Sequence, residues 1–159
     1  MADETSETAR RVERMRAFPQ ELASSMAGWS DADLARRPAP DAWAVSEILC
    51  HLRDVEEFYG QRVQTILANR DPVLVAFEPE RWAIERQYSR CLAKPALDAF
   101  AVRRRETLVV LDAIHAQDWE RGGSHAQRGW MTVRRIVHGW AKHDGEHLEQ
   151  IRRALEGKP

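Results

Sequence analysis

The chain is poor in glycine and cysteine and has no long apolar segment. Only 8 of its 159 residues are glycine, so few tight turns are expected. Its two cysteines, Cys50 and Cys91, belong to no CxxC pair, and we expect both to be reduced and buried. The longest apolar runs, around residues 72–77 and 108–111, are far shorter than the roughly 18 residues of a membrane span. These absences argue against a disulfide-stapled mini-protein and against a membrane protein.

An excess of charge of either sign is also missing. The 24 basic residues nearly balance the 25 acidic ones, and the net charge is −1. This balance argues against a protein that works by neutralising a nucleic-acid backbone. The first residues are acidic and polar, without the apolar stretch of a secretory signal, so we expect a cytoplasmic protein.

The length suits one domain, and we interpret residues 1–159 as a single unit with one core. Hydrophobic residues make up 43% and charged residues 31%, as in ordinary globular proteins, which argues against intrinsic disorder. Six tryptophans and six histidines are many for this size. Those side chains are where function is sought.

Four segments show the three- and four-residue spacing of amphipathic helices, and none alternates over a useful length as a strand does. The predicted helices cover about residues 6–26, 46–69, 95–115 and 132–155. Residues 70–94 form a connection, with a short helix around 80–90, that is long enough for a crossover. Since amphipathic helices need partners, the sequence predicts an all-α four-helix bundle.

Two of these helices carry histidines on their apolar faces. His143 and His147 lie four residues apart, which is the spacing that lets two imidazoles hold one metal ion. His51 lies on the apolar stripe of the second predicted helix, between Ile48 and Val55. A shared divalent ion would offset the cost of burying three imidazoles, and three histidines leave coordination positions open, as in catalytic sites.

The pair alone is a weak signal, because buried histidines often only form hydrogen bonds. A zincin metalloprotease is a poor interpretation, since Asp144 stands where the HExxH motif requires glutamate. Asp54 and Asp144 are candidates to orient the imidazoles, and Asp54 or Glu57 could act as a general base. Each of these acids could equally be a solvated surface group.

Three further positions have two interpretations each. His125 lies in a glycine-flanked loop that could fold over the metal or simply be exposed. Arg104 or Arg105 could pair a carboxylate of a substrate or thiol, although a run of arginines is more often a solvated helix face.

Two stretches resemble the DinB/YfiT-like superfamily of metalloenzymes. They are residues 43–56 (WAVSEILCHLRDVE) and 140–151 (WAKHDGEHLEQI). Residues 100–108 (FAVRRRETL) and the Asp118-Trp119 pair are also similar to that family. The resemblance implies a down-up-up-down bundle with a long crossover after the second helix, and often a homodimer. It further implies that His51, His143 and His147 bind one divalent ion, most often nickel or zinc, with iron or manganese as further candidates.

Characterised members of that superfamily suggest the chemistry. Some are S-transferases that use a low-molecular-weight thiol, bacillithiol or mycothiol, another is a mycothiol-dependent maleylpyruvate isomerase, and others are described as metal-dependent hydrolases. The leading hypothesis is therefore a metal-dependent enzyme, a thiol S-transferase or a hydrolase, that acts on a small molecule. The alternative is a non-catalytic, metal-stabilised bundle that serves as a ligand-binding or dimerisation module.

Overall fold

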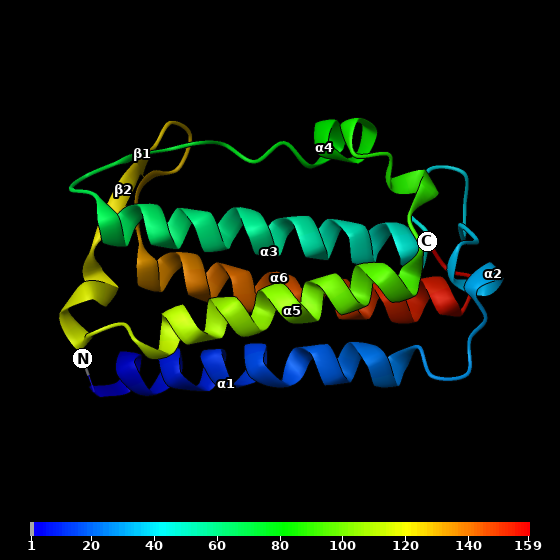
Figure 1. Ribbon diagram of the computed structural model, residues 1–159, viewed down its shortest axis with the longest axis horizontal. Helices are drawn as coiled ribbons and strands as arrows, with labels where there is room; N and C mark the ends of the chain where they lie inside the picture. The colour runs from blue at the N-terminus through cyan, green and yellow to red at the C-terminus, as the bar shows by residue number, and fades with distance from the viewer. Residues whose placement is uncertain (1) are drawn as a thin grey trace.

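Four long helices form a bundle, which confirms the predicted fold class (Figure 1). The computed structural model describes residues 2–159, and the side chains from residue 4 onward. The long helices are α1 (Ala2–Ser25), α3 (Val45–Ala68), α5 (Ala93–Asp112) and α6 (Val133–Leu155). Within this range, no helix is both long enough and apolar enough to cross a bilayer.

The order of the helices places α3 beside α6. In Figure 1, α3 and α5 run in one direction and α1 and α6 in the other, which is the predicted down-up-up-down arrangement. Helix α3 packs against α5 and α6, and α1 packs against the same two helices. The histidine-bearing helices of the sequence analysis, α3 and α6, are therefore antiparallel neighbours.

A long crossover joins the parallel helices α3 and α5. It contains strand β1 (Val73–Leu74), helix α4 (Pro79–Glu85) and the 3-10 helix η1 (Tyr88–Arg90). In Figure 1 the crossover runs along the outer side of α3 for the whole length of the bundle. The short helix expected around residues 80–90 is thus present as two shorter pieces.

The remaining connections are also more ordered than the sequence pattern indicates. Helix α2 (Asp31–Leu34) lies between the first two predicted helices, and at its start the Ser30 side chain accepts a hydrogen bond from the backbone N–H of Asp33. The 3-10 helix η2 (Ala116–Glu120) follows α5.

The structure contains a small sheet, although the sequence pattern predicted no strand. Strands β2 (Gly122–His125) and β3 (Gly129–Thr132) form a hairpin, and β1 pairs in parallel with β2. At Gly123 a Cβ would lie 2.6 Å from the carbonyl oxygen of Pro72, so only glycine allows this approach. Strands this short show no readable alternation, because their pairing is carried by the backbone.

The two histidine-bearing helices, α3 and α6, have different N-terminal caps. The Thr132 hydroxyl caps α6 by accepting the backbone N–H of Arg135 at 3.1 Å. Helix α3 begins at Val45 rather than Ser46, and the Glu47 carboxylate accepts the backbone N–H of Ala44 at 2.8 Å. A glutamate in the first turn satisfies this orphan donor just as a capping box does.

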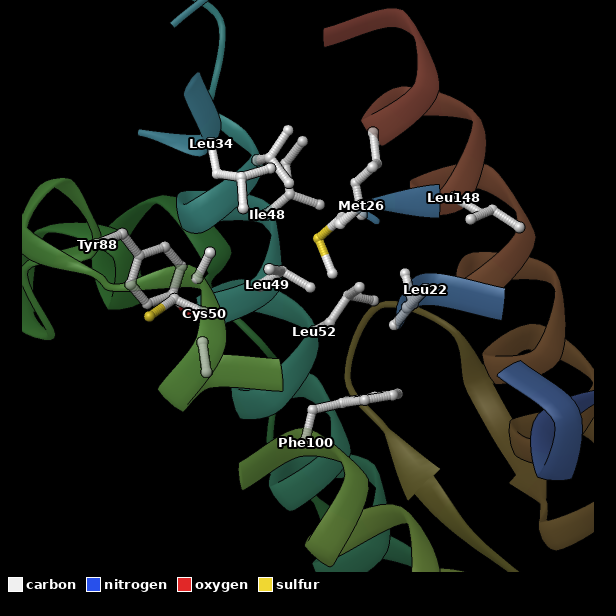
Figure 2. Close-up of a cluster of buried hydrophobic side chains, with 14 of the residues drawn as sticks. Leu22, Met26, Leu34, Ile48, Leu49, Cys50, Leu52, Tyr88, Phe100 and Leu148 are labelled. Atoms are coloured by element: carbon white, nitrogen blue, oxygen red, sulfur yellow. The ribbon is translucent and has the colours of Figure 1, made fainter. Parts of the chain in front are cut away.

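The core is built from the apolar faces that the spacing predicts. At one end of the bundle, side chains from α1, α3, α5 and α6 meet in the cluster drawn in Figure 2. There the rings of Phe18 and Phe100 pack edge to face, with centroids 5.8 Å apart. Leu22, Ile48 and Leu52 are fully buried around them.

The structure contradicts the expectation that both cysteines are reduced. Cys50 and Cys91 are joined in a disulfide that ties α3 to the end of the crossover, so they are not reduced thiols. Their Cα atoms are 6.4 Å apart, within the range that a disulfide spans. Their separation in sequence carries no information about this proximity, which depends on how the crossover returns to α3.

One buried arginine links all four long helices. Arg104 of α5 donates to Glu56 of α3 at 2.8 Å and 3.0 Å, to both oxygens of Asp144 of α6 at 2.8 Å and 3.1 Å, and to the Met15 carbonyl of α1 at 2.9 Å. Arg104 is 0% exposed. Burial alone would lower the pKa of the guanidinium, but Asp144 and Glu56 raise it above its ordinary value.

Substitution Arg104→Met tests this cluster. It leaves two buried carboxylates without a counter-charge, so we expect the free energy of unfolding to fall by about 3–5 kcal/mol. Urea denaturation followed by circular dichroism measures the loss. The neighbouring Arg105 is exposed, and Arg105→Met should change stability by less than about 0.5 kcal/mol. Equal midpoints for the two variants would contradict the role assigned to Arg104.

Candidate metal centre

Three imidazoles meet between α3 and α6. His51 projects from α3, while His143 and His147 project one turn apart from α6. The Nε2 atom of His143 lies 3.1 Å from Nε2 of His51 and 3.0 Å from Nε2 of His147. The structure thus brings together all three histidines singled out in the sequence, with candidate ligand atoms within 4.8 Å of one another.

The environment keeps these rings neutral. Burial, together with the smaller effect of neighbouring imidazoles, lowers the pKa of His51 to about 3 and that of His143 to about 2. Burial also lowers the pKa of His147. Neutral imidazole is the form that binds a metal ion, so no proton has to be removed near neutral pH.

The tautomer of His147 suits coordination. Its Nδ1 lies 2.7 Å from the amide oxygen of Gln150, which can only accept a hydrogen bond. Nδ1 therefore carries the proton, and the lone pair of Nε2 faces the other two rings. Gln150 was not among the predicted site residues, although its position three residues after His147 on one helix was a readable signal.

Two of the three distances between the histidine nitrogens suit one shared ion. Imidazole nitrogens at about 2.0–2.1 Å from a metal lie about 2.9–3.4 Å apart for angles from a right angle to the tetrahedral angle. The two Nε2 distances of 3.0 and 3.1 Å fall in that range. The buried Nδ1 atoms of His51 and His143 have no partner among the described residues.

The three rings form part of the wall of a cavity of about 380 Å³. The Trp43 ring packs against His51 at a tilt of 52°, with centroids 5.2 Å apart, and Phe77 of the crossover approaches the same ring at 5.9 Å. The β2–β3 hairpin closes another side with His125, Gln127 and Arg128. The rest of the lining is mostly apolar and comes from α3 and the crossover: Val55, Tyr59, Arg62, Ala76, Pro79 and Glu80.

Comparison with known families agrees with this arrangement. Residues 14–151 match the sequence model of the DinB superfamily. The chain belongs to the DinB superfamily. This membership confirms the resemblance drawn from residues 43–56 and 140–151, and the match contains all three clustered histidines.

Individual relatives of this DinB-superfamily chain are distant in sequence. A protein of Oceanobacillus iheyensis, whose name proposes a metal-dependent hydrolase, is 21% identical over 145 residues, which are 91% of this chain and 83% of the relative. The structure of YfiT from Bacillus subtilis, described as a proposed metal-dependent hydrolase with an unusual four-helix bundle topology, matches with a TM-score of 0.86. That match has 15% identity and covers 97% of this chain and 90% of YfiT.

A second solved structure shares the fold over part of its length. The mycothiol-dependent maleylpyruvate isomerase matches with a TM-score of 0.72 and 10% identity. The match covers 91% of this chain but 60% of the isomerase. The likeness shows a common bundle.

Two predicted acids of the DinB bundle lie away from the cavity. Asp54 is fully buried and accepts hydrogen bonds from the Tyr88 hydroxyl at 2.9 Å and from Arg53 at 2.8 Å. Glu57 pairs with Arg103 at 2.9 Å. Neither carboxylate lines the cavity that contains the histidines.

Among the described residues, no hydrogen bond joins Asp54 or Asp144 to an imidazole nitrogen. Asp144 is held by Arg104 inside the core, which also removes Arg104 as a partner for a substrate carboxylate. Arg105 is exposed and lines a separate surface depression together with Asp112 and Arg16. The predicted helix periodicity placed these groups on the right elements but could not distinguish a core ion pair from a site contact.

The other three histidines have different surroundings. His125 is buried in β2 and lines the cavity, as the loop-folding interpretation expects. His138 bonds to the hydroxyl of Thr8 at 2.9 Å, and His115 is exposed. Only His125 joins the three clustered histidines at the cavity.

Replacing Asp54 with asparagine tests its structural role. The change removes the charge that accepts from Tyr88 and Arg53 and pairs with Arg86 at 3.0 Å. We expect the free energy of unfolding to fall by about 1–3 kcal/mol, measured by urea denaturation. Asp98→Asn, at an exposed position on α5, is the control and should change little. An unchanged Asp54→Asn midpoint would contradict this assignment.

Proposed function

We propose that His51, His143 and His147 bind one divalent metal ion, and that the protein is a metal-dependent enzyme acting on a small molecule. The observation that carries the proposal is the convergence of three neutral Nε2 atoms on one point of a cavity wall. Nickel and zinc suit an all-imidazole ligand set, and iron or manganese are further candidates. Three protein ligands leave positions for water or substrate, as in catalytic sites.

A divalent ion at this site would act as a Lewis acid that lowers the pKa of a bound water or thiol toward neutrality. The residues of the chain supply the setting for that chemistry. Trp43 and Phe77 fix the plane of the His51 ring, and Gln150 fixes the tautomer of His147. The apolar walls limit the water that competes with a substrate.

Two reactions fit this setting, hydrolysis by water and transfer to a thiol. Hydrolysis is supported by the names of the Oceanobacillus iheyensis and Bacillus subtilis relatives, and thiol dependence by that of the isomerase. Parallel assays of the metal-loaded protein with ester substrates, and with electrophiles in the presence of thiols, distinguish them. Homodimerisation and a cytoplasmic location remain part of the proposal, with the Cys50–Cys91 disulfide as an exception to the usual reduced state of cytosolic cysteines.

The acid–base role predicted for Asp54 or Glu57 takes a modified form here. Both carboxylates are engaged by arginines outside the cavity, and Asp54 lies one turn from His51 on α3. We therefore propose that they position α3 and its histidine, rather than accept a proton from the substrate.

Removing one histidine tests the metal site. Protein purified without a polyhistidine tag should contain about one divalent ion per chain by mass spectrometry of the metal content, and His51→Ala should contain none. His115→Ala replaces an exposed histidine and should retain the ion. Full occupancy in folded His51→Ala would refute the ligand set. Bound metal and a chelator-sensitive melting temperature, without turnover of any assayed substrate, would favour the non-catalytic bundle.

The hydrogen bond from His147 to Gln150 gives a graded test. Gln150→Ala removes the acceptor that fixes the ring, so the dissociation constant of the metal should rise about 10- to 100-fold. Competition with a chromophoric chelator measures this change. Glu149→Ala, at the exposed neighbouring position, should leave the affinity unaltered. Equal affinities in both variants would remove Gln150 from the proposed site.

A further inference from the structure

The arginines of the chain include two that are buried, and their surroundings differ. Arg104 is paired with two carboxylates. Arg62 of α3 is 7% exposed, and no ion pair joins it to an acid anywhere in the described chain. Its polar partner is the carbonyl oxygen of Val75 in the crossover. Burying a guanidinium without a counter-charge is costly, so an anionic group bound beside Arg62 would offset that cost.

The position of Arg62 relates it to the three histidines. It follows His51 by about three turns, so it lies on the same face of α3, about 16 Å further along the helix axis. A long helical side chain leans back toward the N-terminus of its helix, in the direction of His51. Arg62 and the three histidines line the same cavity. A ligand that reached both would be elongated.

The groups around Arg62 are mostly donors: among the described residues no acid forms an ion pair with it, and Glu80 is the carboxylate that lines the same cavity. Its guanidinium lies over the rings of Phe58 and Tyr59, 4.5 Å and 5.4 Å from their centroids. Arg128 and His125 of the hairpin line the same cavity. The Nδ1 atom of His125 accepts the backbone N–H of Gln127 at 3.2 Å, so its Nε2 carries the proton and can donate.

We propose that Arg62 binds the carboxylate of an elongated substrate whose other end reaches the three histidines. Arg128 and His125 are the further donors to that carboxylate. Arg62 is buried whereas Arg128 is exposed to solvent, so one negative charge is enough to balance the buried cation, and a carboxylate carries one. Arg62 is thus the specificity residue of the cavity. The contact of the ligand with the metal rests on the proposed function, whereas the contact of its carboxylate with Arg62 does not depend on that proposal.

Matched probes test the carboxylate preference. Thiolates bind divalent metals, so 6-mercaptohexanoate and 6-mercaptohexan-1-ol differ only at the end that would meet Arg62. Calorimetric titration of the metal-loaded protein should give a dissociation constant about 10- to 100-fold lower for the carboxylate. In Arg62→Gln this preference should disappear, while the alcohol binds as before. Arg70→Gln, at an exposed position just beyond α3, should keep the preference.

The variant Arg128→Gln guards against misfolding of Arg62→Gln. It changes an exposed turn and should reduce the preference several-fold without changing the melting temperature. Equal binding of the two thiols to wild-type protein would overturn the assignment of Arg62 while leaving the metal proposal intact.

A second measurement tests the carboxylate site of Arg62 in the absence of a metal ion. In chelator-treated protein, hexanoate should shift the Nε–Hε resonance of Arg62, assigned by its absence from Arg62→Gln, and hexanol should not. Such a shift supports the carboxylate site, and if the same protein takes up no divalent ion when one is added back, the metal proposal fails while the carboxylate proposal stands. No shift with hexanoate would overturn the proposal for Arg62.

Discussion

The arrangement of the bundle depends on one guanidinium. Arg104 is bonded to a carbonyl of α1 and to carboxylates of α3 and α6, so each long helix has a fixed point at the same level of the core. Hydrophobic packing alone tolerates small shifts of one helix along another, but a guanidinium that satisfies three partners at once does not. Since Glu56 and Asp144 share α3 and α6 with the clustered histidines, this fixed point also sets the distance between the two helices that carry them.

The same residue type has two opposite roles in this chain. Arg104 lies among carboxylates in the core, and the aromatic rings of Phe100 and Trp140 cover it at 4.9 and 5.6 Å. Arg62 lies over aromatic rings too, but its charged end meets a cavity instead of an acid. Arg104 and Arg62 are both buried, so burial alone does not separate them. The carboxylates paired with Arg104 mark a structural ion cluster, and their absence around Arg62 among the described residues marks a binding group.

Much of the site was readable from the sequence because it follows helical geometry. The spacing of His143 and His147, and the place of His51 on an apolar stripe, determine which way the rings point once the helices are amphipathic. The roles of Arg104, Asp54 and Asp144 were not readable, because the identity of a partner across the bundle depends on helix level and rotation. The disulfide and the three short strands were missed for a similar reason: each depends on where the crossover and the hairpin return to α3.

The disulfide has a topological consequence. Because Cys50 and Cys91 are bonded, residues 50–91 form a closed covalent ring, and this ring carries His51, Arg62 and the crossover wall of the cavity. A protease that cut the exposed crossover around Val75 would therefore open the ring without releasing either piece. The two halves of the cavity wall would stay tethered beside His51, and the nick would become visible as separate fragments only after reduction.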